Sequence, residues 1–404
     1  YRAGTAGTLP TISLGTAKYG NGTQTATYTA KDIQNLPAGT YTQVVEVKGT
    51  AGYQGLRQEL TFTVTGTVPT AASVAPTAVA PLSGASVATH TAKQKEFIGL
   101  PAAQRKRVLA VHYERERAEY AANDGHPQPV RLRWNGGDGE CTVKVYRGNE
   151  TTPVQTHVVV TRWTNGNFLD VDNLEVGRAY RWTVTNGKGT AEGSFVTEDE
   201  TPRLFNAGVV GNTRDLGGIV GMDGRRVRQG MFLRSRCFDT NKKATYASIL
   251  TATEEAFFRD FIGLKTEIDL RGDTWITQSF VPGVTTRVNT AWPLDYTGAY
   301  LTDATKRTAM KAALAPIFDA AKYPIDVHCH SGQDRTGMYC FILEALLGVS
   351  EADCIRDWEW SALGNSGFNA GDTYQLDSFL SKFRTLTGST TQAKAETFMA
   401  WLGY

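Results

Sequence analysis

The sequence predicts a multidomain chain, with all-β sandwich modules in its N-terminal part and an α/β domain, a central sheet flanked by helices, in its C-terminal part. Three observations support this fold class. Short runs that alternate polar and apolar residues recur through the first half, which is the period of half-buried strands. From Thr201 onward, apolar runs of strand length alternate with longer helical segments, as in α/β domains. The length of 404 residues is enough for two or three domains.

The composition narrows the classes of function. Apolar residues make up 41% of the chain and charged residues 20%, as in globular proteins. The net charge is +2 and there is no basic block, so the composition does not favour nucleic-acid binding. No run of 18 apolar residues occurs, so no membrane span is expected. The 5 cysteines are an odd and sparse set, which argues against a disulfide framework and predicts at least one free thiol.

Residues 1–67 are predicted to form a β module. Strand-like alternation is visible at 41–47 and 60–64, and the turn before the first of these reads Asn-Leu-Pro-Ala-Gly-Thr-Tyr. A second copy of the turn, with the same Asn-Leu-x-x-Gly spacing before a Tyr, occurs at 173–180. Both copies resemble the tyrosine corner of immunoglobulin-like and fibronectin type III sandwiches. We interpret the first module as a short, incomplete immunoglobulin-like spacer in preference to an adhesion or glycan-binding module.

Residues 68–126 are predicted to be a linker followed by a charged helix. Pro69, Pro76 and Pro81 lie among Ala, Ser and Thr, a composition typical of an extended, semi-rigid tether over 68–90. Residues 93–122 have a helical pattern in which Arg105 and the neighbouring charged side chains mostly face solvent.

Residues 127–199 are predicted to form a second sandwich, similar to fibronectin type III domains. The predicted strands lie at 130–134, 141–146, 157–161, 180–184 and 193–196. Trp134 and Trp182 are expected in its core.

The segment 323–350 organises the C-terminal domain, residues 200–404. An apolar strand at 325–327 leads into a polar loop and then into a helical apolar run at 338–347. A strand, a tight loop and a helix in this order direct backbone N–H groups and a helix N-terminus at one point, which makes an anion site. Cys329 begins the loop, and Arg335, whose planar side chain binds phosphate through two hydrogen bonds, follows it.

A longer string in this segment resembles the active-site loop of cysteine-dependent protein tyrosine phosphatases. The string reads HCHSGQDRTG from His328 to Gly337. Its Asp-Arg-Thr-Gly ending is similar to atypical bacterial tyrosine phosphatases related to dual-specificity and lipid phosphatases. The segments NTRDLGG at 212–218 and IDLR at 268–271 are similar to the same family. The resemblance covers about half of the chain and implies the fold of the C-terminal domain.

The resemblance also implies the chemistry. Cys329 is the expected nucleophile and forms a phosphocysteine, while Arg335 holds the phosphoryl oxygens. Either Asp334 or Asp295 is expected to protonate the leaving oxygen. Asp334 is slightly favoured, because the Trp-Pro-Leu-Asp segment that ends at Asp295 carries one residue more than the family's mobile acid loop. No metal and no cofactor are expected.

Other residues have predicted secondary roles. His328 is expected to orient the loop, and Arg214 and Asp215 either brace the fold or contact substrate. Bracing is slightly favoured for Asp215, and the two roles are equally favoured for Arg214. The predicted phosphate-binding residues of the loop are His330, Ser331, Gly332, Gln333 and Thr336.

One position of the loop departs from the family. Relatives usually carry Lys where this chain has Gln333, which weakens the prediction of a polyphosphorylated substrate. His330 partly replaces that charge when it is protonated, below about pH 6.5.

Three functions remain open from the sequence. The first is a protein tyrosine phosphatase, with dual specificity as an extension, and the second is an inositol-phosphate or phosphoinositide phosphatase. The third is a surface protein that binds phosphorylated ligands without catalysis, which the retention of Cys329, Asp334 and Arg335 together argues against.

The expected partners and location follow from the same interpretation. The substrate is a phosphorylated protein or a small phosphomonoester, and the front β modules are candidates for binding surface or partner proteins. The chain starts at Tyr1 without a signal-peptide pattern. With its glycine-rich and threonine-rich first half, this favours a secreted, cell-surface or periplasmic bacterial protein whose leader is absent from the sequence.

Overall fold

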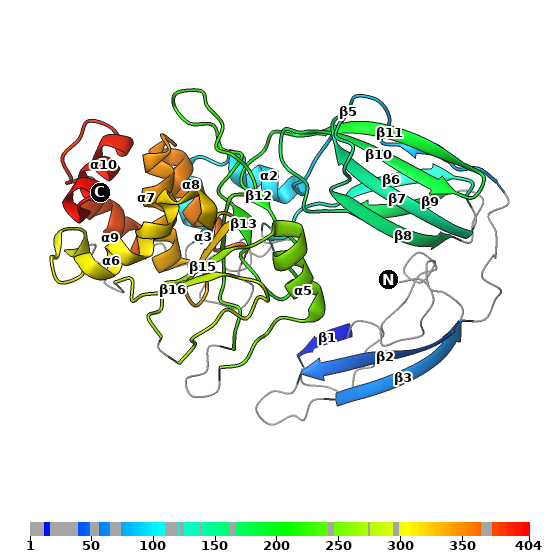
Figure 1. Cartoon of the computed structure of the whole chain (residues 1–404), viewed down its shortest axis with the longest axis horizontal. Coiled ribbons are helices and arrows are strands. Elements are labelled where there is room, and N and C mark those ends of the chain that lie inside the picture. Colours follow the sequence, from blue (N-terminus) through cyan, green and yellow to red (C-terminus); the bar gives the residue numbers. More distant parts are fainter. Residues whose placement is uncertain are drawn as a thin grey trace. The chain divides into compact units, whose positions relative to one another are not determined.

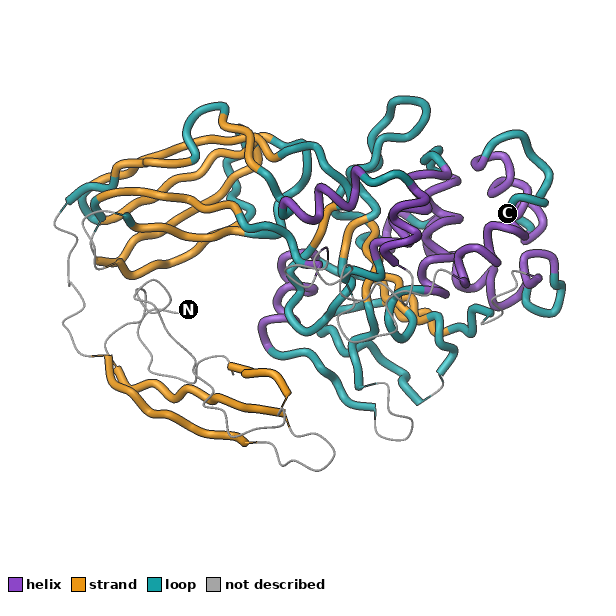
Figure 2. The backbone as a smooth tube through the Cα atoms, turned by 180° about the vertical axis from the view of Figure 1, so that it is seen from behind, coloured by secondary structure: helices purple, strands orange, loops and turns teal. Residues whose placement is uncertain are grey.

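The computed structural model describes most of the chain after residue 73. The described residues are 12–16, 39–48, 56–64, 74–109, 120, 125–137, 139–161, 166–240, 246–273, 275–293, 299–364 and 374–404. The candidate proton donor Asp295 lies outside them. The chain forms two compact units, and Figure 2 shows strands dominating one and helices gathered in the other. The β unit consists of Tyr1–Val87, Arg131–Val171 and Ala179–Val196, and the α/β unit of Ala88–Val130, Asp172–Arg178 and Thr197–Tyr404.

The described parts of residues 1–67 form a sheet of three strands, β1 (Ile12–Thr16), β2 (Gly39–Lys48) and β3 (Leu56–Val64). β1 runs parallel to β2, and β2 pairs antiparallel with β3. The strands expected at 41–47 and 60–64 lie within β2 and β3. The immunoglobulin-like character of this module stays a prediction.

Two further sheets make up the rest of the β unit. One has the strand order β5-β11-β10-β7-β8 and the other β4-β6-β9. Buried and accessible residues alternate along β6 and β7, so each sheet has one face turned inward, as the two-residue period predicts. Trp134 and Trp182 are fully buried. The strands are β6 (Val130–Asn135), β7 (Gly139–Arg147), β8 (Gln155–Thr161), β9 (Asn167–Val171), β10 (Ala179–Asn186) and β11 (Gly189–Thr197).

The predicted tether over 68–90 differs from the structure. β4 (Thr77–Ala80) pairs antiparallel with β6, and β5 (Ala85–Val87) lies at the edge of the larger sheet. Pro81 falls between the two strands, and its carbonyl oxygen accepts a hydrogen bond from Trp182 Nε1 at 2.9 Å. Both strands are edge strands, where proline is tolerated because the edge needs fewer ladder hydrogen bonds. The segment therefore contains strands despite its proline content.

The charged segment that follows belongs to the α/β unit and contains two helices, α2 (Ala92–Gly99) and α3 (Ala102–Leu109). The helix expected over 93–122 breaks at Leu100, which adopts an extended conformation because it precedes Pro101. Arg105 is buried at 6% exposure, so the expectation that it faces solvent is wrong. The helical periodicity alone could not show that Arg105 has a charged partner elsewhere in the chain.

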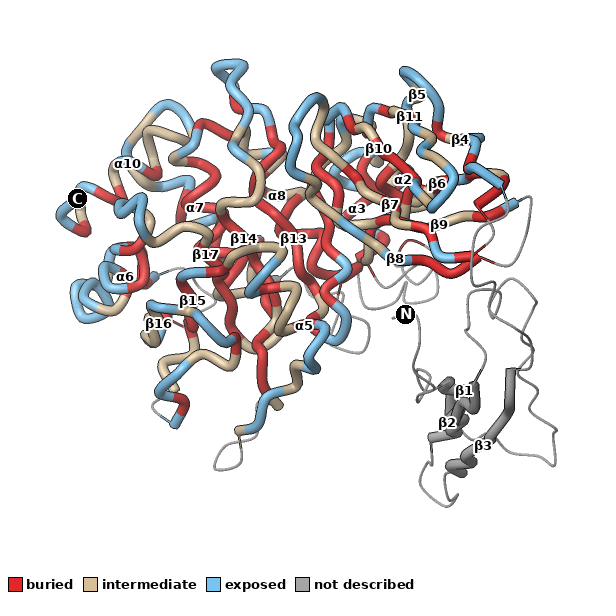
Figure 3. The backbone as a smooth tube through the Cα atoms, turned by 45° about the vertical axis from the view of Figure 1, so that its right-hand side comes forward, coloured by how far each residue is buried: buried red, intermediate tan, exposed pale blue. Residues whose placement is uncertain are grey.

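The α/β unit is built on a sheet of six strands in the order β12-β13-β14-β17-β15-β16. β14, β17, β15 and β16 run parallel to one another, and β12 and β13 add an antiparallel edge. Every residue of β14, β15 and β17 is buried, and Figure 3 shows them coloured as such. The strands are β12 (Arg203–Leu204), β13 (Arg214–Asp215), β14 (Phe232–Ser235), β15 (Thr266–Asp269), β16 (Thr286–Asn289) and β17 (Ile325–His328).

The two faces of this sheet are covered differently. One face packs against α7 (Asp334–Leu346) and the other C-terminal helices, which share a large apolar core with the inward side chains of β15 and β17 (Figure 1). The opposite face meets a smaller aromatic cluster under α5 (Ala252–Ala256) and the π-helical turn η3 (Phe257–Ile262).

The remaining helical elements surround the large core. They are η4 (Ala299–Thr302), α6 (Arg307–Leu314), η5 (Ala315–Phe318), η6 (Ala320–Lys322), α8 (Glu351–Trp360), α9 (Tyr374–Phe383) and α10 (Thr391–Leu402). The register pairs His328 with Ser235 on one side and with Asp269 on the other. The loops that follow these strand ends therefore leave the sheet at the same edge, where ligands bind in open α/β sheets.

None of the helices in the described part of the chain combines the length and the apolar character needed to cross a membrane.

Candidate active site

The loop between β17 and α7 makes a sharp turn that only glycine permits. Gly332 has φ +70°, a left-handed conformation, and a Cβ at this residue would lie 2.1 Å from the carbonyl oxygen of Ser235. The peptide N–H of Gly337 then bonds to the carbonyl oxygen of Gln333 at 2.8 Å and starts the helix. The loop residues 329–333 are thus folded directly onto the N-terminus of α7.

The carbonyl oxygens of the loop are held from outside. Asn212 Nδ2 donates to the carbonyl oxygens of Ser331 and Gly332, both at 3.1 Å, and Arg234 Nη2 donates to that of Gly332 at 2.7 Å. The peptide N–H of Cys237 donates to the carbonyl oxygen of His330 at 3.1 Å. Because the N–H and C=O of a peptide unit point in opposite directions, this fixes the N–H groups toward the inside of the loop.

The group that holds these oxygens is itself buried and charged, and we call it the arginine brace. Arg234 Nη1 contacts Asp357 Oδ2 at 2.5 Å, and Arg214 Nε contacts Asp357 Oδ1 at 2.6 Å. The hydroxyl of Ser361 accepts hydrogen bonds from both guanidinium groups, at 3.0 and 3.2 Å. The members of the brace are Asn212, Arg214, Arg234, Asp357 and Ser361.

The carboxyl group of Asp357 stays ionised in this setting. Burial on its own raises its pKa, but Arg214 and Arg234 outweigh burial and hold the pKa below its ordinary value. Asp357 lies on α8, whose next residue, Trp358, packs against α7. A Cβ at Gly337 would approach the Trp358 ring to 2.6 Å, so glycine is needed there for the two helices to meet.

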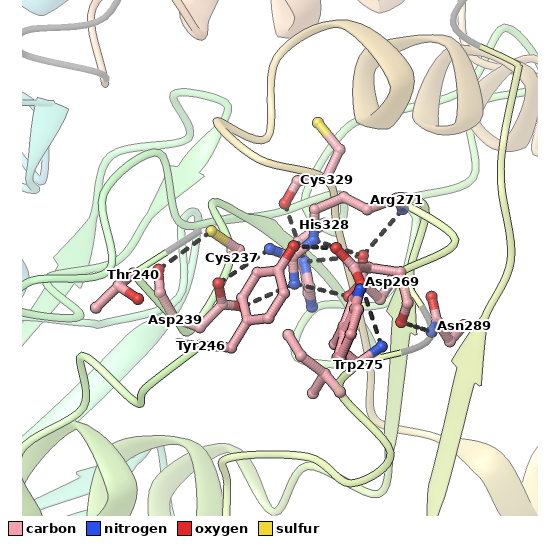
Figure 4. Close-up of polar contacts among 12 residues, drawn as sticks. Cys237, Asp239, Thr240, Tyr246, Asp269, Arg271, Trp275, Asn289, His328 and Cys329 are labelled. Carbon is pink, nitrogen blue, oxygen red and sulfur yellow. Dashed lines mark hydrogen bonds and ion pairs between the residues drawn. The ribbon is translucent and has the colours of Figure 1, made fainter. Parts of the chain in front are cut away.

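A second group of buried charges lies on the other face of the sheet, and we call it the carboxylate network. Arg287 bridges Glu267 Oε1 at 3.0 Å and Asp269 Oδ2 at 2.6 Å, and Arg271 contacts Asp269 and Asp239 at 2.7 Å each. Figure 4 shows Asp239, Asp269 and Arg271 around His328. The members of the network are Asp239, Glu267, Asp269, Arg271, Arg287 and His328.

His328 is a buried imidazolium. Its Nε2 lies 3.0 Å from Glu267 Oε1 and its Nδ1 lies 3.1 Å from the carbonyl oxygen of Cys329. Both partners are acceptors, so both ring nitrogens must donate. Burial lowers the pKa of His328, but Asp269 and Glu267 outweigh it and raise the pKa to about 9. His328 thereby fixes the backbone of Cys329, while the Cys329 sulfur points away from the network in Figure 4.

Glu267, Asp269 and His328 place three donor atoms within 4.8 Å of one another, a spacing that suits a metal ion. The same carboxylate oxygens already contact Arg287 and Arg271. An ion at this place would have to displace two guanidinium groups and a protonated imidazole. The donor set therefore fits an ion-pair network better than a metal centre.

Cys329, the residue that follows β17, is 3% exposed. Burial raises its pKa, but the charge of Arg335, together with the nearby hydroxyl and amide of Thr336, lowers it below the ordinary value for cysteine. The nearby carboxylate of Asp334 acts in the opposite direction. Arg335 itself is fixed by a 3.3 Å hydrogen bond from Nη1 to the carbonyl oxygen of Leu270.

The other cysteines have the chemistry of core thiols. All five are buried and none is in a disulfide. Burial raises the pKa of Cys237 to about 11, and it raises the pKa of Cys340 and Cys354 as well. Their thiols therefore stay protonated at neutral pH, in contrast to that of Cys329.

The remaining predicted loop residues lie around Cys329. Gln333 and Thr336 are buried, and His330, Ser331 and Asp334 are partly exposed. His330 has a lowered pKa, first because of burial and then because of the charges of three arginines. These arginines are Arg236, Arg271 and Arg335.

Arg214 and Asp215 are both fully buried in β13. Arg214 belongs to the arginine brace. Asp215 contacts Arg203 Nη1 at 3.0 Å and accepts hydrogen bonds from the N–H groups of Gly217 and Gly230. In both cases the contacts are those of a bracing residue.

Sequence reasoning missed several residues that support the loop, namely Asn212, Arg234, Asp239, Glu267, Arg287 and Ser361. A signal for some of them exists. Charged residues at 267 and 269 alternate with apolar ones in a strand that is buried on both faces, and buried charges require partners. The identity of the partners depends on contacts between distant parts of the chain.

Residues 206–401 match the model described as the tyrosine phosphatase family. The C-terminal region is an α/β phosphatase domain, and its match to this family covers just under half of the chain. The match and the loop around Cys329 make the chain a protein tyrosine phosphatase-like hydrolase.

Solved structures with a likeness to the phosphatase domain include the core catalytic domain of the PP-IP phosphatase SIW14 from S. cerevisiae in complex with citrate. It is 14% identical with a TM-score of 0.23, and the match covers 38% of this chain and 93% of that one. TpbA of P. aeruginosa is 14% identical with a TM-score of 0.26, covering 44% and 89%. A cysteine-to-serine variant of TpbA in complex with phosphotyrosine is 12% identical with a TM-score of 0.24, covering 44% and 90%. No curated protein matches the chain.

Proposed function

We propose that this chain hydrolyses phosphotyrosine in proteins through a phosphocysteine intermediate on Cys329. The observation that carries the proposal is the state of this thiol. It lies at the head of α7, and its pKa is lowered by Arg335 and Thr336 although burial acts against it. A thiolate at neutral pH is the nucleophilic form of cysteine.

The surroundings of the thiolate suit a phosphoryl dianion. The loop amides face inward because Asn212 and Arg234 hold the carbonyl oxygens outward. The helix N-terminus and the guanidinium of Arg335 add positive charge at the same point. Groups fixed in advance where charge gathers stabilise the transition state without having to reorganise.

The proposed reaction has two steps. The Cys329 sulfur forms a bond to phosphorus while the ester P–O bond breaks, and a carboxylic acid gives its proton to the leaving oxygen. Water then attacks phosphorus and gives a proton back to the carboxylate, the S–P bond breaks, and inorganic phosphate and the thiolate are released. Asp334 is the favoured proton donor, since it lies close enough to influence the thiol, and Asp295 is the alternative.

The depth of the thiol supports an aryl substrate. Cys329 is 3% exposed, so the phosphoryl group must pass below the surface before it reaches sulfur. A phosphotyrosyl side chain extends further from the backbone than phosphoserine or phosphothreonine. Dual specificity is therefore proposed only as a weaker, secondary activity.

An inositol phosphate is the second candidate substrate. The observation in its favour is the cationic surrounding of His330, where Arg236 and Arg271 act together with Arg335. A second phosphate of the substrate would find positive charge there. The buried Gln333, at the position where relatives carry Lys, argues in the other direction.

The test is phosphate release, measured without added metal, from an aryl phosphate, from phosphotyrosine, phosphoserine and phosphothreonine peptides, and from inositol phosphates. The expected result is turnover of the aryl and phosphotyrosine substrates, reduced at least about a thousandfold in Cys329→Ser. Cys141→Ser is the matched control, because that thiol donates to the carbonyl oxygen of Gly137 at 3.0 Å and a hydroxyl can do the same.

The other outcomes are equally informative. Preference for inositol phosphates would transfer the proposal to the second candidate. A folded wild-type protein that releases phosphate from none of these substrates would exclude the proposed function and favour a phospho-ligand-binding protein.

A further inference from the structure

Residues 88–109, which we call the helical strap, belong to the α/β unit although they precede the strands β6–β11 in the sequence. They contain α2 and α3 and lie outside residues 206–401, the part that matches the phosphatase family. Nothing in the proposed function uses them. Their contacts nevertheless converge on the end of α8.

The polar contact of the strap is a buried ion pair. Arg105 Nε lies 2.6 Å from Glu359 Oε2, and the side chains are 8% and 5% exposed. Arg105 Nη1 also donates to the carbonyl oxygen of Leu100 at 2.6 Å, which ties α3 to the end of α2. Since removing one member of a buried ion pair leaves the other without compensation, this contact holds the two segments in a defined geometry.

The apolar contacts of the strap reach the neighbouring residue, Trp360. The rings of Phe97 and His90 approach the Trp360 ring edge-on, with centroids 6.1 and 6.0 Å away. His90 is oriented by its Nε2, which lies 2.8 Å from the carbonyl oxygen of Pro202. Phe97 and Trp360 are almost fully buried in a shared apolar cluster, so the strap seals this side of α8.

The same stretch of α8 carries the arginine brace on its other side. Asp357 holds Arg234, and the hydroxyl of Ser361 accepts from Arg234 at 3.2 Å. Arg234 in turn holds the carbonyl oxygen of Gly332. Residues two apart on a helix do not share a face, so Asp357 can contact the brace while Glu359 contacts the strap.

We propose that the helical strap is a positioning element of the phosphatase site. By fixing Glu359 and Trp360, it sets the position of Asp357 and Ser361, and through Arg234 it sets the direction in which the loop amides point. The proposal rests on the proposed function only in that the loop binds a phosphoryl group. Arg105 is a positioning residue, since it acts through Glu359 and not on substrate.

The decisive variant is Arg105→Met in the full chain, with Lys106→Met as the matched control. Lys106 is the next residue of α3, and its ion pair with Asp377 is exposed, with side-chain exposures of 56% and 48%. Two readouts report on the loop independently of turnover. They are the inhibition or dissociation constant of orthovanadate, and the pH at which iodoacetate alkylation of Cys329 reaches half its limiting rate, with Cys329→Ser as the blank.

In Arg105→Met, the vanadate constant is expected to rise about tenfold and the alkylation midpoint to move to higher pH, because misdirected amides stabilise both anions less. kcat should fall more than KM changes, while Lys106→Met should resemble the wild type. Arg105→Lys, which restores the charge, should recover part of the loss. A purely structural role would lower the melting temperature and leave the vanadate constant and the alkylation midpoint unchanged at a temperature where the variant is folded, and that result would overturn the proposal.

If Arg105→Met does not fold, Glu359→Gln decides by the same readouts. The amide keeps the shape and one acceptor of the carboxylate, so the effect should have the same sign and a smaller size. Both readouts remain valid if no substrate is turned over. Failure of the proposed function would appear as a wild type without turnover, whereas failure of the present inference would appear as variants whose anion binding equals that of the wild type.

Discussion

Two networks of buried charges support the catalytic loop from opposite faces of the central sheet, and they differ in composition. The carboxylate network balances Asp239, Glu267 and Asp269 against Arg271, Arg287 and the His328 imidazolium. The arginine brace sets two guanidinium groups against the single carboxylate of Asp357. The first network is therefore close to neutral, and the second carries excess positive charge.

This difference indicates a division of labour. The carboxylate network reaches the loop through one group, His328, which fixes the backbone at Cys329, the proposed nucleophile. The arginine brace reaches it through the carbonyl oxygens of residues 331–333, which fixes the amides that face the phosphoryl group. One network thus determines where the sulfur is, and the other determines what binds beside it.

The largest effect is expected from breaking the arginine brace with Asp357→Asn. Two buried guanidinium groups would lose their only carboxylate within the brace, which should lower the free energy of unfolding by about 3–5 kcal/mol. The value of kcat/KM on an aryl phosphate should fall by about a hundredfold. Urea unfolding and steady-state kinetics measure both quantities.

Glu351→Gln is the control for this variant, because Glu351 lies on the same helix and pairs with an exposed arginine, Arg384. Glu351→Gln is expected to lower the free energy of unfolding by less than about 1 kcal/mol. An equal loss of unfolding free energy in the two variants would show that burial of the Asp357 ion pairs contributes nothing to stability. That result would contradict the difference proposed between the two networks.

An intermediate effect is expected from pH, and between pH 6.5 and 9 it should come from the carboxylate network. The pKa of His328 is raised from 6.5 to about 9, so its contribution to stability is complete below pH 6.5 and is lost as the pH rises through 9. This loss is on the order of 3 kcal/mol for a fully buried group. The free energy of unfolding, measured from pH 6 to pH 10, should fall accordingly.

The arginine brace adds to the profile only at its alkaline end, because burial and the charge of Arg234 lower the pKa of Arg214 to about 10. At acid pH the dependence is opposite, and the free energy of unfolding falls as the pH falls. The pKa of Asp269 is lowered from 3.8 to about 2, so its contribution is present above pH 3.8 and is lost as the pH falls through 2. A flat profile between pH 6.5 and 9 would mean that His328 is neutral in the folded state.

The smallest effect is expected from Glu267→Gln. The charge of Asp269 is the largest single cause that raises the pKa of His328, and Arg287 keeps its contact with Asp269. The variant should therefore lower the pKa of His328 without neutralising it, cost about 1–2 kcal/mol of stability and reduce activity only a few-fold. NMR titration of the imidazole measures the pKa, and Asp260→Asn, which alters the exposed pair with Arg259, is the control. An unchanged pKa would contradict the assignment of Glu267 as its partner.

The loop itself could be predicted from the sequence because its signal is local. An apolar strand, a loop with Gly332 and a helical run follow one another within 323–350, and the structure brings Cys329, Asp334 and Arg335 together in this order. Trp134 and Trp182 were expected in the core of the second sandwich, and both are buried. In these cases residues that are close in the sequence determine the structure.

The supports could not be predicted because their partners are remote in the sequence. The charge of Arg105 is indistinguishable from that of its solvated neighbours until Glu359 is placed against it. Likewise, the roles of Arg214 stayed equally open until its contact with Asp357, 143 residues away, was known. The prediction of a tether at 68–90 was wrong for a related reason. Edge strands such as β4 depend on a neighbouring strand more than on their own composition.

The separation between Arg105 and Glu359 has a consequence for biosynthesis. The two residues are 254 positions apart. At the usual rate of synthesis, roughly 5–20 residues per second, Glu359 is made roughly 13–50 seconds after Arg105. During that interval the nascent strap has neither Glu359 nor Trp360 to contact, while the strands that follow it are being completed. The β unit therefore emerges from the ribosome first. The loop around Cys329 becomes fixed only when nearly the whole polypeptide has emerged.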